Sequence, residues 1–137
     1  MIFYDWLHVA GDADFRGDCP SETAEQVTFF NQLRKLYPNG LGKIAIHIRN
    51  EGNRTMYQTR REKYEGMVTG AADIVIPGKP CLVIELKRQD HTKSRLEKEQ
   101  VEYLKAAQEA GAEVCVALGW KAAMEFIYDK IDKTNIL

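Results

Sequence analysis

The sequence predicts an α/β domain in which a mixed four-stranded sheet is flanked by helices, in the order α-β-β-β-α-β-α. Short apolar runs alternate with longer segments of helical periodicity, and Pro- and Gly-rich turns separate them. The chain has 137 residues, 45% of them hydrophobic, which suffices for one core without disulfides or metals. We expect an irregular lead-in over residues 1–20 and a single domain over 21–137.

The first half of the chain begins with the lead-in, where glycines and aspartates are scattered among aromatic residues. It has room for a short helix or strand at 4–9. Ser21 is then a good N-cap for a helix that runs to Leu36, with an apolar stripe along one face. The turn sequence Tyr37-Pro38-Asn39-Gly40 ends this helix.

Three strands are expected next. Residues 43–49 alternate at period 2, which predicts a strand with Ile44, Ile46 and Ile48 facing the core. A polar stretch with one or two helical turns at 57–64 follows. Two apolar runs then flank a Pro-Gly-Lys-Pro turn, which predicts a hairpin of strands 72–76 and 81–87.

The second half completes the pattern. Ser94 and Glu97 form an S-x-x-E capping box that predicts the start of a helix, and Gly111 is a candidate C-cap. The apolar run 112–118 predicts the fourth strand, and 120–131 an amphipathic helix.

Composition excludes several classes of protein. There are 19 Lys and Arg against 20 Asp and Glu, a formal net charge of −1, which argues against binding nucleic acid by bulk charge but leaves room for a local basic patch. No apolar run approaches the length of a membrane span. The three cysteines form no C-x-x-C motif, and the N-terminus lacks the features of a secretory signal, so we expect an intracellular, cytoplasmic protein with free thiols.

The strand 81–87 carries the chemical anomaly of the sequence. Glu85 and Lys87 stand two residues apart in an otherwise apolar run, so both side chains lie on one face of the sheet. Burying such charges is costly unless they are paired or hold a ligand. A salt bridge on an exposed sheet face is the simpler alternative.

A third charged residue, Asp73, begins the preceding strand, and the hairpin places it within reach of Glu85. Carboxylates are hard ligands for Mg²⁺ or Mn²⁺, and such a site suits phosphodiester hydrolysis. Lys87 would then orient the attacking water or neutralise charge that develops on phosphorus.

Two polar residues interrupt the helical stripes. Glu22 lies at the start of the first helix and Gln100 within the second. A favourable charge at a helix N-terminus would explain Glu22, and a position at the rim of the stripe would explain Gln100. Alternatively both belong to the site, with Glu25 as another acidic ligand from the first helix.

In this order and context, these residues resemble the PD-(D/E)XK nuclease superfamily and, more narrowly, the VRR-NUC family of virus-type replication-repair nucleases, which includes small stand-alone phage proteins. The resemblance runs from about Glu22 to Ile127. The stretches that carry it are Glu22–Gln26, Asn50–Gly52, Gly66–Asp73, Ile84–Lys87 and Ser94–Gln100. One departure is Gly70-Ala71-Ala72-Asp73, where the family usually has G-x-P-D.

The resemblance implies a restriction-endonuclease-like core and a role for each matching residue. Asp73 and Glu85 would be metal ligands, with the main-chain carbonyl of Leu86 as a third. Lys87 would be the catalytic lysine. Glu22 would complete the site through metal or water, and Gln100 would support it.

A nuclease must also hold a polyanion, and two groups of basic residues flank the proposed carboxylates. The candidates for nucleic-acid contact are Arg49, Arg54, Arg60, Arg61 and Lys63 on one side, and Arg88, Lys93, Arg95 and Lys98 on the other. A solvated charged surface is the alternative reading of both groups.

The resemblance implies an Mg²⁺- or Mn²⁺-dependent DNA endonuclease that acts on branched or flapped DNA. Small phage members of the family are similar to Holliday-junction resolvases, so we expect a homodimer with no membrane association. The residues are equally compatible with a monomeric nickase or flap nuclease. The competing hypotheses are a non-catalytic nucleic-acid-binding or assembly module on the same fold, and a small protein whose acidic residues form only surface pairs.

Overall fold

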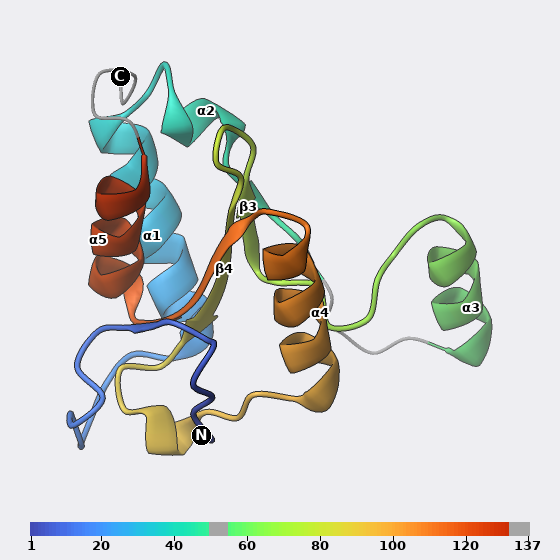
Figure 1. Ribbon diagram of the computed structural model, residues 1–137, viewed down its shortest axis with the longest axis horizontal. Helices are drawn as coiled ribbons and strands as arrows, with labels where there is room; N and C mark the ends of the chain where they lie inside the picture. The colour runs from blue at the N-terminus through green and yellow to red at the C-terminus, as the bar shows by residue number, and fades with distance from the viewer. Residues whose placement is uncertain (50–54, 132–137) are drawn as a thin grey trace.

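The computed structural model describes residues 1–49 and 55–131, in which five α-helices and five strands form one α/β body (Figure 1). The strands are β1 (Val9–Ala10), β2 (Ile46–His47), β3 (Ile74–Ile76), β4 (Leu82–Lys87) and β5 (Glu113–Leu118). The helices are α1 (Glu22–Leu36), α2 (Leu41–Ile44), α3 (Met56–Tyr64), α4 (Lys98–Glu109) and α5 (Trp120–Lys130), with a 3₁₀ turn at His91–Lys93.

The sheet is mixed and has the strand order β1-β5-β4-β3-β2. The predicted hairpin is present, with β3 antiparallel to β4 and Ile74 opposite Ile84. β4 runs parallel to β5, and β2 lies antiparallel to β3 at the edge. Helices α1 and α5 cover one face of the sheet and α4 covers the other (Figure 1). The predicted fold class is therefore confirmed.

The sheet has one strand more than predicted because the lead-in contributes β1. Val9 lies beside Val116 and Ala10 beside Ala117, in a parallel pairing with β5. Leu7 is buried in the same layer, next to side chains of α4 and β5. This pairing joins two distant parts of the chain, so no local periodicity could announce it.

The predicted strand 43–49 is wrong in length and in phase. A helical turn, α2, precedes it, and β2 contains two residues. Ile44 and Ile46 are 43% and 51% exposed, and Ile48 is half-buried, while Ala45 between them is buried. A shift of one residue turns alternate side chains to the opposite face, and here the turn of α2 directs the smaller Ala45 to the core.

The start of the second long helix is also corrected. α4 begins at Lys98 with Glu97 as its N-cap, and the Glu97 N–H donates to Gln100 Oε1 over 2.8 Å. Ser94 lies outside the helix because its hydroxyl has other partners, described below. By contrast, α1 begins where predicted, with Ser21 Oγ accepting the Ala24 N–H.

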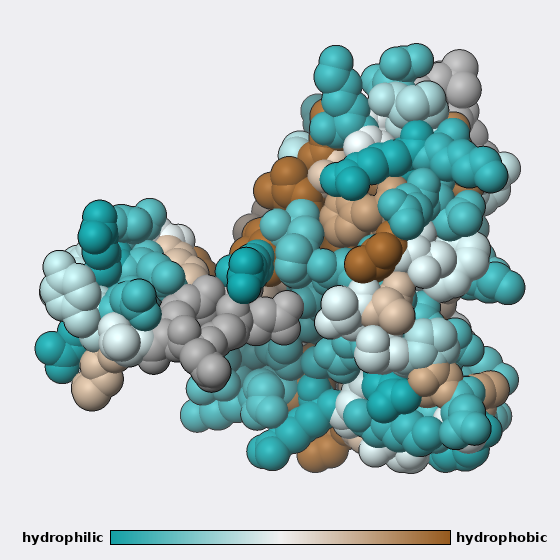
Figure 2. All heavy atoms as spheres, turned by 180° about the vertical axis from the view of Figure 1, so that it is seen from behind, coloured by the Kyte–Doolittle hydropathy of each residue, from teal (hydrophilic) through white to brown (hydrophobic). Residues whose placement is uncertain are grey.

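Helix α3 stands apart from the body (Figure 1), and Figure 2 shows it from behind as a separate lobe. Each of its residues is exposed or half-buried. Over residues 1–49 and 55–131, no helix is long and apolar enough to cross a membrane.

Candidate active site

The two charged residues of β4 are buried beneath α4. Glu85 is 2% exposed and Lys87 4% exposed, on the face of the sheet that α4 covers. Their neighbours Ile84 and Leu86 point to the opposite face and pack against α1 and α5. A salt bridge on an exposed sheet face is therefore excluded as the explanation for this pair.

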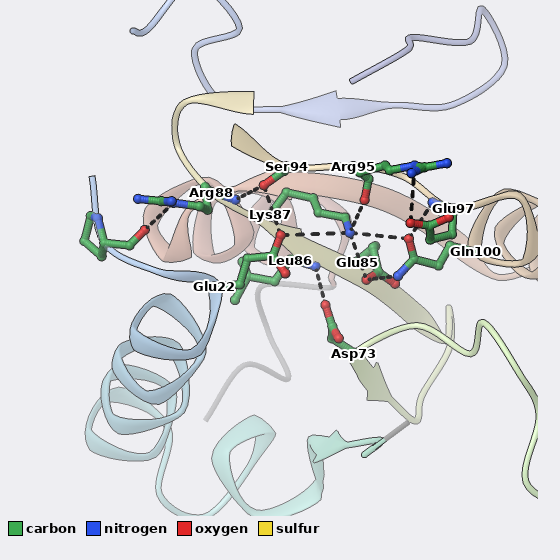
Figure 3. A network of polar contacts seen from close by, with 11 residues as sticks. Glu22, Asp73, Glu85, Leu86, Lys87, Arg88, Ser94, Arg95, Glu97 and Gln100 are labelled. Carbon is green, nitrogen blue, oxygen red and sulfur yellow. Dashed lines mark hydrogen bonds and ion pairs between the residues drawn. The ribbon is translucent and has the colours of Figure 1, made fainter. Parts of the chain in front are cut away.

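The Lys87 ammonium lies at the centre of a group of oxygens (Figure 3). Its Nζ donates to the carbonyl of Arg95 over 2.7 Å and to Gln100 Oε1 over 3.3 Å. Carboxylate oxygens of Glu85 and Glu22 lie 3.8 Å and 4.0 Å from it. An ammonium has three protons to donate, so these partners hold it in one place.

Glu85 is bonded through one oxygen. Its Oε1 accepts a hydrogen bond of 3.1 Å from Gln100 Nε2, while the buried Oε2 has no hydrogen-bond partner within the described part of the chain. Burial, and next the nearby carboxylate of Asp73, raise the pKa of Glu85 well above its usual range, against the opposing charge of Lys87. The negative form of Glu85 is therefore unfavourable in these surroundings, in which Oε2 accepts no hydrogen bond from the described residues.

Asp73 faces the same point from the edge of β3. Its Oδ2 accepts the main-chain N–H of Leu86 over 2.9 Å, which holds the carboxylate against β4. The N–H and C=O of one residue point to the same side of an extended strand, so the Leu86 carbonyl also points toward this edge. At the other end of Asp73, its carbonyl accepts the Ile48 N–H over 2.8 Å and contacts His47 Nδ1.

Asp73 opens onto solvent through a pocket of about 330 Å³. The pocket is lined by Glu22, Thr23, Gln26, His47, Arg49, Asp73 and Leu86. It therefore joins the start of α1, the edge strand β2 and the centre of β4, and it brings together three of the residues expected at the site.

Gln100 connects the two charges of β4. Its amide nitrogen donates to Glu85, and its amide oxygen accepts from Lys87 and from the N–H of Glu97. The interruption of the apolar stripe of α4 is thus explained by a side chain that binds both charged groups and also caps its own helix.

Glu22 reaches the site through Ser94, a residue for which the sequence indicated a different role. The Ser94 hydroxyl donates to Glu22 Oε1 over 3.0 Å and accepts the N–H of Arg88 over the same distance. Ser94 therefore fixes the carboxylate of α1 relative to the end of β4. An extended Ser three residues before an N-cap gives no signal of this kind in the sequence.

Glu25 is not a ligand of this site. Its side chain is buried, and its two oxygens accept from Gln89 Nε2 and from the N–H of Trp120, each over 2.7 Å. The carboxylate therefore caps the N-terminus of α5, where a negative charge is favourable.

The donor set fits a divalent cation of the Mg²⁺ type. Within residues 1–49 and 55–131, no three His, Cys, Asp or Glu side chains are grouped to hold a metal. Mg²⁺ binds through one or two carboxylates and retains several waters, so two carboxylates, a carbonyl and an open pocket are sufficient. One oxygen of the buried Glu85 carboxylate has no hydrogen-bond partner among the described residues, and the nearby carboxylate of Asp73 raises the pKa of Glu85, so a cation here would meet two acidic groups.

The basic residues differ in their surroundings. Arg49 lines the pocket, while Arg60, Arg61 and Lys63 lie on α3. Arg95 and Lys98 are exposed, each close to a glutamate of α4 or its cap. Arg54 lies outside the described residues, as do residues 50–52 of the matched stretches.

Arg88 and Lys93 bind the lead-in. The Arg88 guanidinium donates to the carbonyls of Cys19 and Pro20, and Lys93 Nζ donates to that of Gly17. Asp90 belongs to no motif of the sequence. Its carboxylate accepts the N–H of Gly17 and both the hydroxyl and the N–H of Thr92. These bonds, led by that to the Thr92 hydroxyl, lower the pKa of Asp90 to about 2. They tie residues 17–20, which precede Glu22, to the loop after β4.

A comparison with solved structures finds a VRR_NUC domain protein that superposes with a TM-score of 0.66, covering 81% of this chain and 88% of that chain at 20% sequence identity. No family model and no curated protein matches the sequence. The structural likeness shows a shared fold, and it confirms at the level of the fold the resemblance drawn from the motifs.

Proposed function

We propose that this chain is an Mg²⁺- or Mn²⁺-dependent deoxyribonuclease that hydrolyses phosphodiester bonds. The observation that carries the proposal is the arrangement at β4. A buried Glu85, one of whose oxygens has no hydrogen-bond partner among the described residues, lies near Asp73, and the Nζ of the buried Lys87 lies 3.8 Å from Glu85 Oε1. The shared fold with a VRR_NUC domain protein supports it.

Asp73, Glu85 and the carbonyl of Leu86 would hold the cation, with Glu22 acting directly or through water. When bound, the cation supplies a water of lowered pKa and polarises the phosphodiester. The chain supplies the positions: Leu86 fixes Asp73 through its N–H, and Gln100 fixes Glu85. Such outer partners are what keep metal-binding carboxylates in place.

Lys87 is the proposed catalytic cation. The Arg95 carbonyl and the Gln100 amide orient its ammonium, and carboxylate oxygens of Glu22 and Glu85 lie 4.0 Å and 3.8 Å from it. A charge that is already oriented stabilises developing negative charge on the phosphate without reorganisation during the reaction. In this proposal the same ammonium would also orient an attacking water.

The proposed substrate is DNA with a branch or a flap, cut by a homodimer in the manner of Holliday-junction resolvases. This proposal follows the resemblance to small phage nucleases. Arg49, which lines the pocket, and the basic residues of α3 support contact with a polyanion. A monomer that nicks or removes flaps is compatible with the same site.

The test is cleavage of branched, flapped and linear DNA with Mg²⁺ or Mn²⁺ by the wild-type chain, Asp73→Ala and Lys87→Ala. The matched controls are Glu113→Ala and Lys130→Ala, which break an exposed acid–lysine pair of 3.6 Å that includes none of the site residues. We expect cleavage by wild type and controls and none by the two site variants.

Absence of cleavage by the wild type on every substrate would contradict the proposal and favour a non-catalytic nucleic-acid-binding module. Equal cleavage by wild type and Asp73→Ala would show that another site, or a contaminant, does the chemistry. The ratio of rates on branched and linear DNA tests the structure selectivity separately.

A further inference from the structure

One face of α3 combines aromatic and basic side chains. At 3.6 residues per turn, Tyr57, Arg60, Arg61 and Tyr64 lie along one side of the helix. The two tyrosines are 73% and 93% exposed. The half-buried residues of the helix, Thr59 and Glu62, lie on the opposite side. The aromatic and basic face is therefore turned to solvent.

Packing within the chain gives α3 little support. A helix of nine residues is marginal by itself, and α3 depends on its Thr55–Gln58 capping box and on an exposed Arg61–Glu65 pair of 2.9 Å. Exposing two large aromatic rings on such a helix is unfavourable unless a partner covers them. This face therefore has the character of a binding surface.

The chain segments before and after α3 both connect to the proposed active site. β2 precedes α3, and the Ile48 N–H donates to the carbonyl of Asp73, with which the chain returns from α3 to the sheet. The segment that carries α3 is therefore joined to the sheet at Asp73, a residue proposed to bind the metal. A DNA strand bound to α3 would be bound by this segment. Arg49, on the outgoing side, lines the pocket.

The chemistry of the face matches a nucleic-acid strand with unpaired bases. Aromatic rings stack on bases of any sequence, and arginines bind the adjacent phosphates. In a duplex the faces of the bases are already stacked on one another, so tyrosines gain this contact only on an unpaired strand. The two rings are roughly 10 Å apart along the helix, which suits a few nucleotides.

We propose that the Tyr57–Arg60–Arg61–Tyr64 face of α3, a helix whose flanking segments meet the proposed site at Ile48 and Asp73, binds single-stranded DNA with the tyrosines stacking on unpaired bases. This inference rests on the proposed nuclease function, since it names the part of the substrate that α3 recognises. A second copy of the chain is a poorer occupant, because packing this face on itself brings four arginines together.

The test is binding by the full chain in EDTA, measured by fluorescence anisotropy with a labelled oligothymidylate, an abasic strand of equal length and a blunt duplex of equal length. The abasic strand keeps the phosphates and lacks the bases. We expect wild type to prefer oligothymidylate over the abasic strand, and each of Tyr57→Ala and Tyr64→Ala to weaken oligothymidylate binding about tenfold.

Two variants make the result specific. The double variant Tyr57→Phe with Tyr64→Phe keeps the rings and should bind as wild type does, whereas the double alanine variant should lose the preference for bases over the abasic strand. Tyr128→Ala removes a half-exposed tyrosine on α5 and serves as the matched control, with unchanged binding.

Equal oligothymidylate affinity of wild type and the double alanine variant would overturn the proposal. Sedimentation adds one more contrary outcome: a wild-type dimer that the double alanine variant dissociates, with DNA affinity unchanged, would make this face an interface between copies. Because binding is measured without metal, these outcomes are independent of cleavage. A chain that binds the strand but cuts no DNA would refute the nuclease proposal and leave this one standing.

Discussion

The charged residues of β4 and the helix α3 differ in burial and in the contacts that fix their positions. Glu85 and Lys87 are buried, and neighbours from α1, α4 and the loop after β4 determine their positions. On α3, the tyrosines are exposed, and local caps maintain the helix. Chemistry on a phosphate needs atoms fixed within fractions of an ångström, whereas contact with a flexible strand tolerates movement. The difference therefore matches the proposed roles, in which the residues of β4 carry out the reaction and α3 binds the substrate.

The largest effect should come from removing the central charge. We expect Lys87→Met to lower the rate of DNA cleavage by about 10²–10³-fold, because a preoriented cation is lost from the site. Single-turnover rates with saturating enzyme measure it. A rate within a few-fold of wild type would show that the buried lysine has only a structural role, and the contrast between the two regions would then lose its functional meaning.

Next in size should be the loss of the side chain that joins both charges. We expect Gln100→Ala to lower activity by about 10–100-fold and to raise the metal concentration needed for half-maximal rate. Gln108→Ala on the same helix, which breaks a 3.2 Å bond to the Trp6 carbonyl, is the matched control. If both glutamine variants behave alike, the effect lies in the stability of α4 and not in the site.

The burial of Glu85 predicts a conflict between stability and function. Its folded pKa is raised, so the ionised form opposes folding once the pH exceeds the unfolded value near 4.5. At pH 7 without metal, Glu85→Gln should therefore raise the melting temperature by a few degrees. Mg²⁺ or Mn²⁺ should stabilise wild type but not the variant. Calorimetry measures both the melting temperature and its change with metal. A Glu85→Gln variant that is less stable than wild type without metal would contradict the view that the ionised Glu85 opposes folding.

The corresponding test on α3 should give a smaller change. We expect Arg60→Ala to reduce the slope of log affinity against log salt by about one for single-stranded DNA, with cleavage chemistry unaltered at saturating substrate. Titrations at several salt concentrations measure the slope. An unchanged slope would mean that this arginine contacts no phosphate.

The smallest effect concerns the bonds that tie the lead-in to the loop after β4. The pKa of Asp90 is lowered to about 2 from 3.8, so its ionised form stabilises the fold above pH 4, and this contribution disappears as the pH falls to about 2. Asp90→Asn should therefore be less stable than wild type at pH 7 and equally stable near pH 2. Urea unfolding across this range measures the difference, and a constant difference would contradict the role of the charge.

The sequence predicted the parts of the molecule that local pattern determines. Helix α1, the β3–β4 hairpin and the shared face of Glu85 and Lys87 follow from periodicity and turn chemistry. The residues expected at the site also lie near one another: Glu22, Asp73, Glu85, Lys87 and Gln100.

Three of the errors, those at Glu25, Ser94 and β1, have a common cause, which is a partner distant in sequence. Glu25 caps a helix that begins at Trp120, and Ser94 binds Glu22. β1 requires β5. None of these three is visible in a window of neighbouring residues, because each depends on how the elements pack. The error at Ala45 has a local cause: the turn of α2 directly before it places Ala45, instead of the neighbouring isoleucines, in the core.

The pairing of Val9 with Val116 has a consequence for the timing of folding. During synthesis β1 emerges before β2, β3 and β4, and its partner strand β5 follows all of them, so the β1–β5 pairing must wait for the elements between them. Helix α3, by contrast, has its capping box and its ion pair within residues 55–65, and carbonyls of its last turn accept N–H groups from Gly66 and Met67, so these bonds need no distant strand. In a nascent chain, the partners of these α3 bonds are therefore available before the sheet that holds Glu85 and Lys87 is complete.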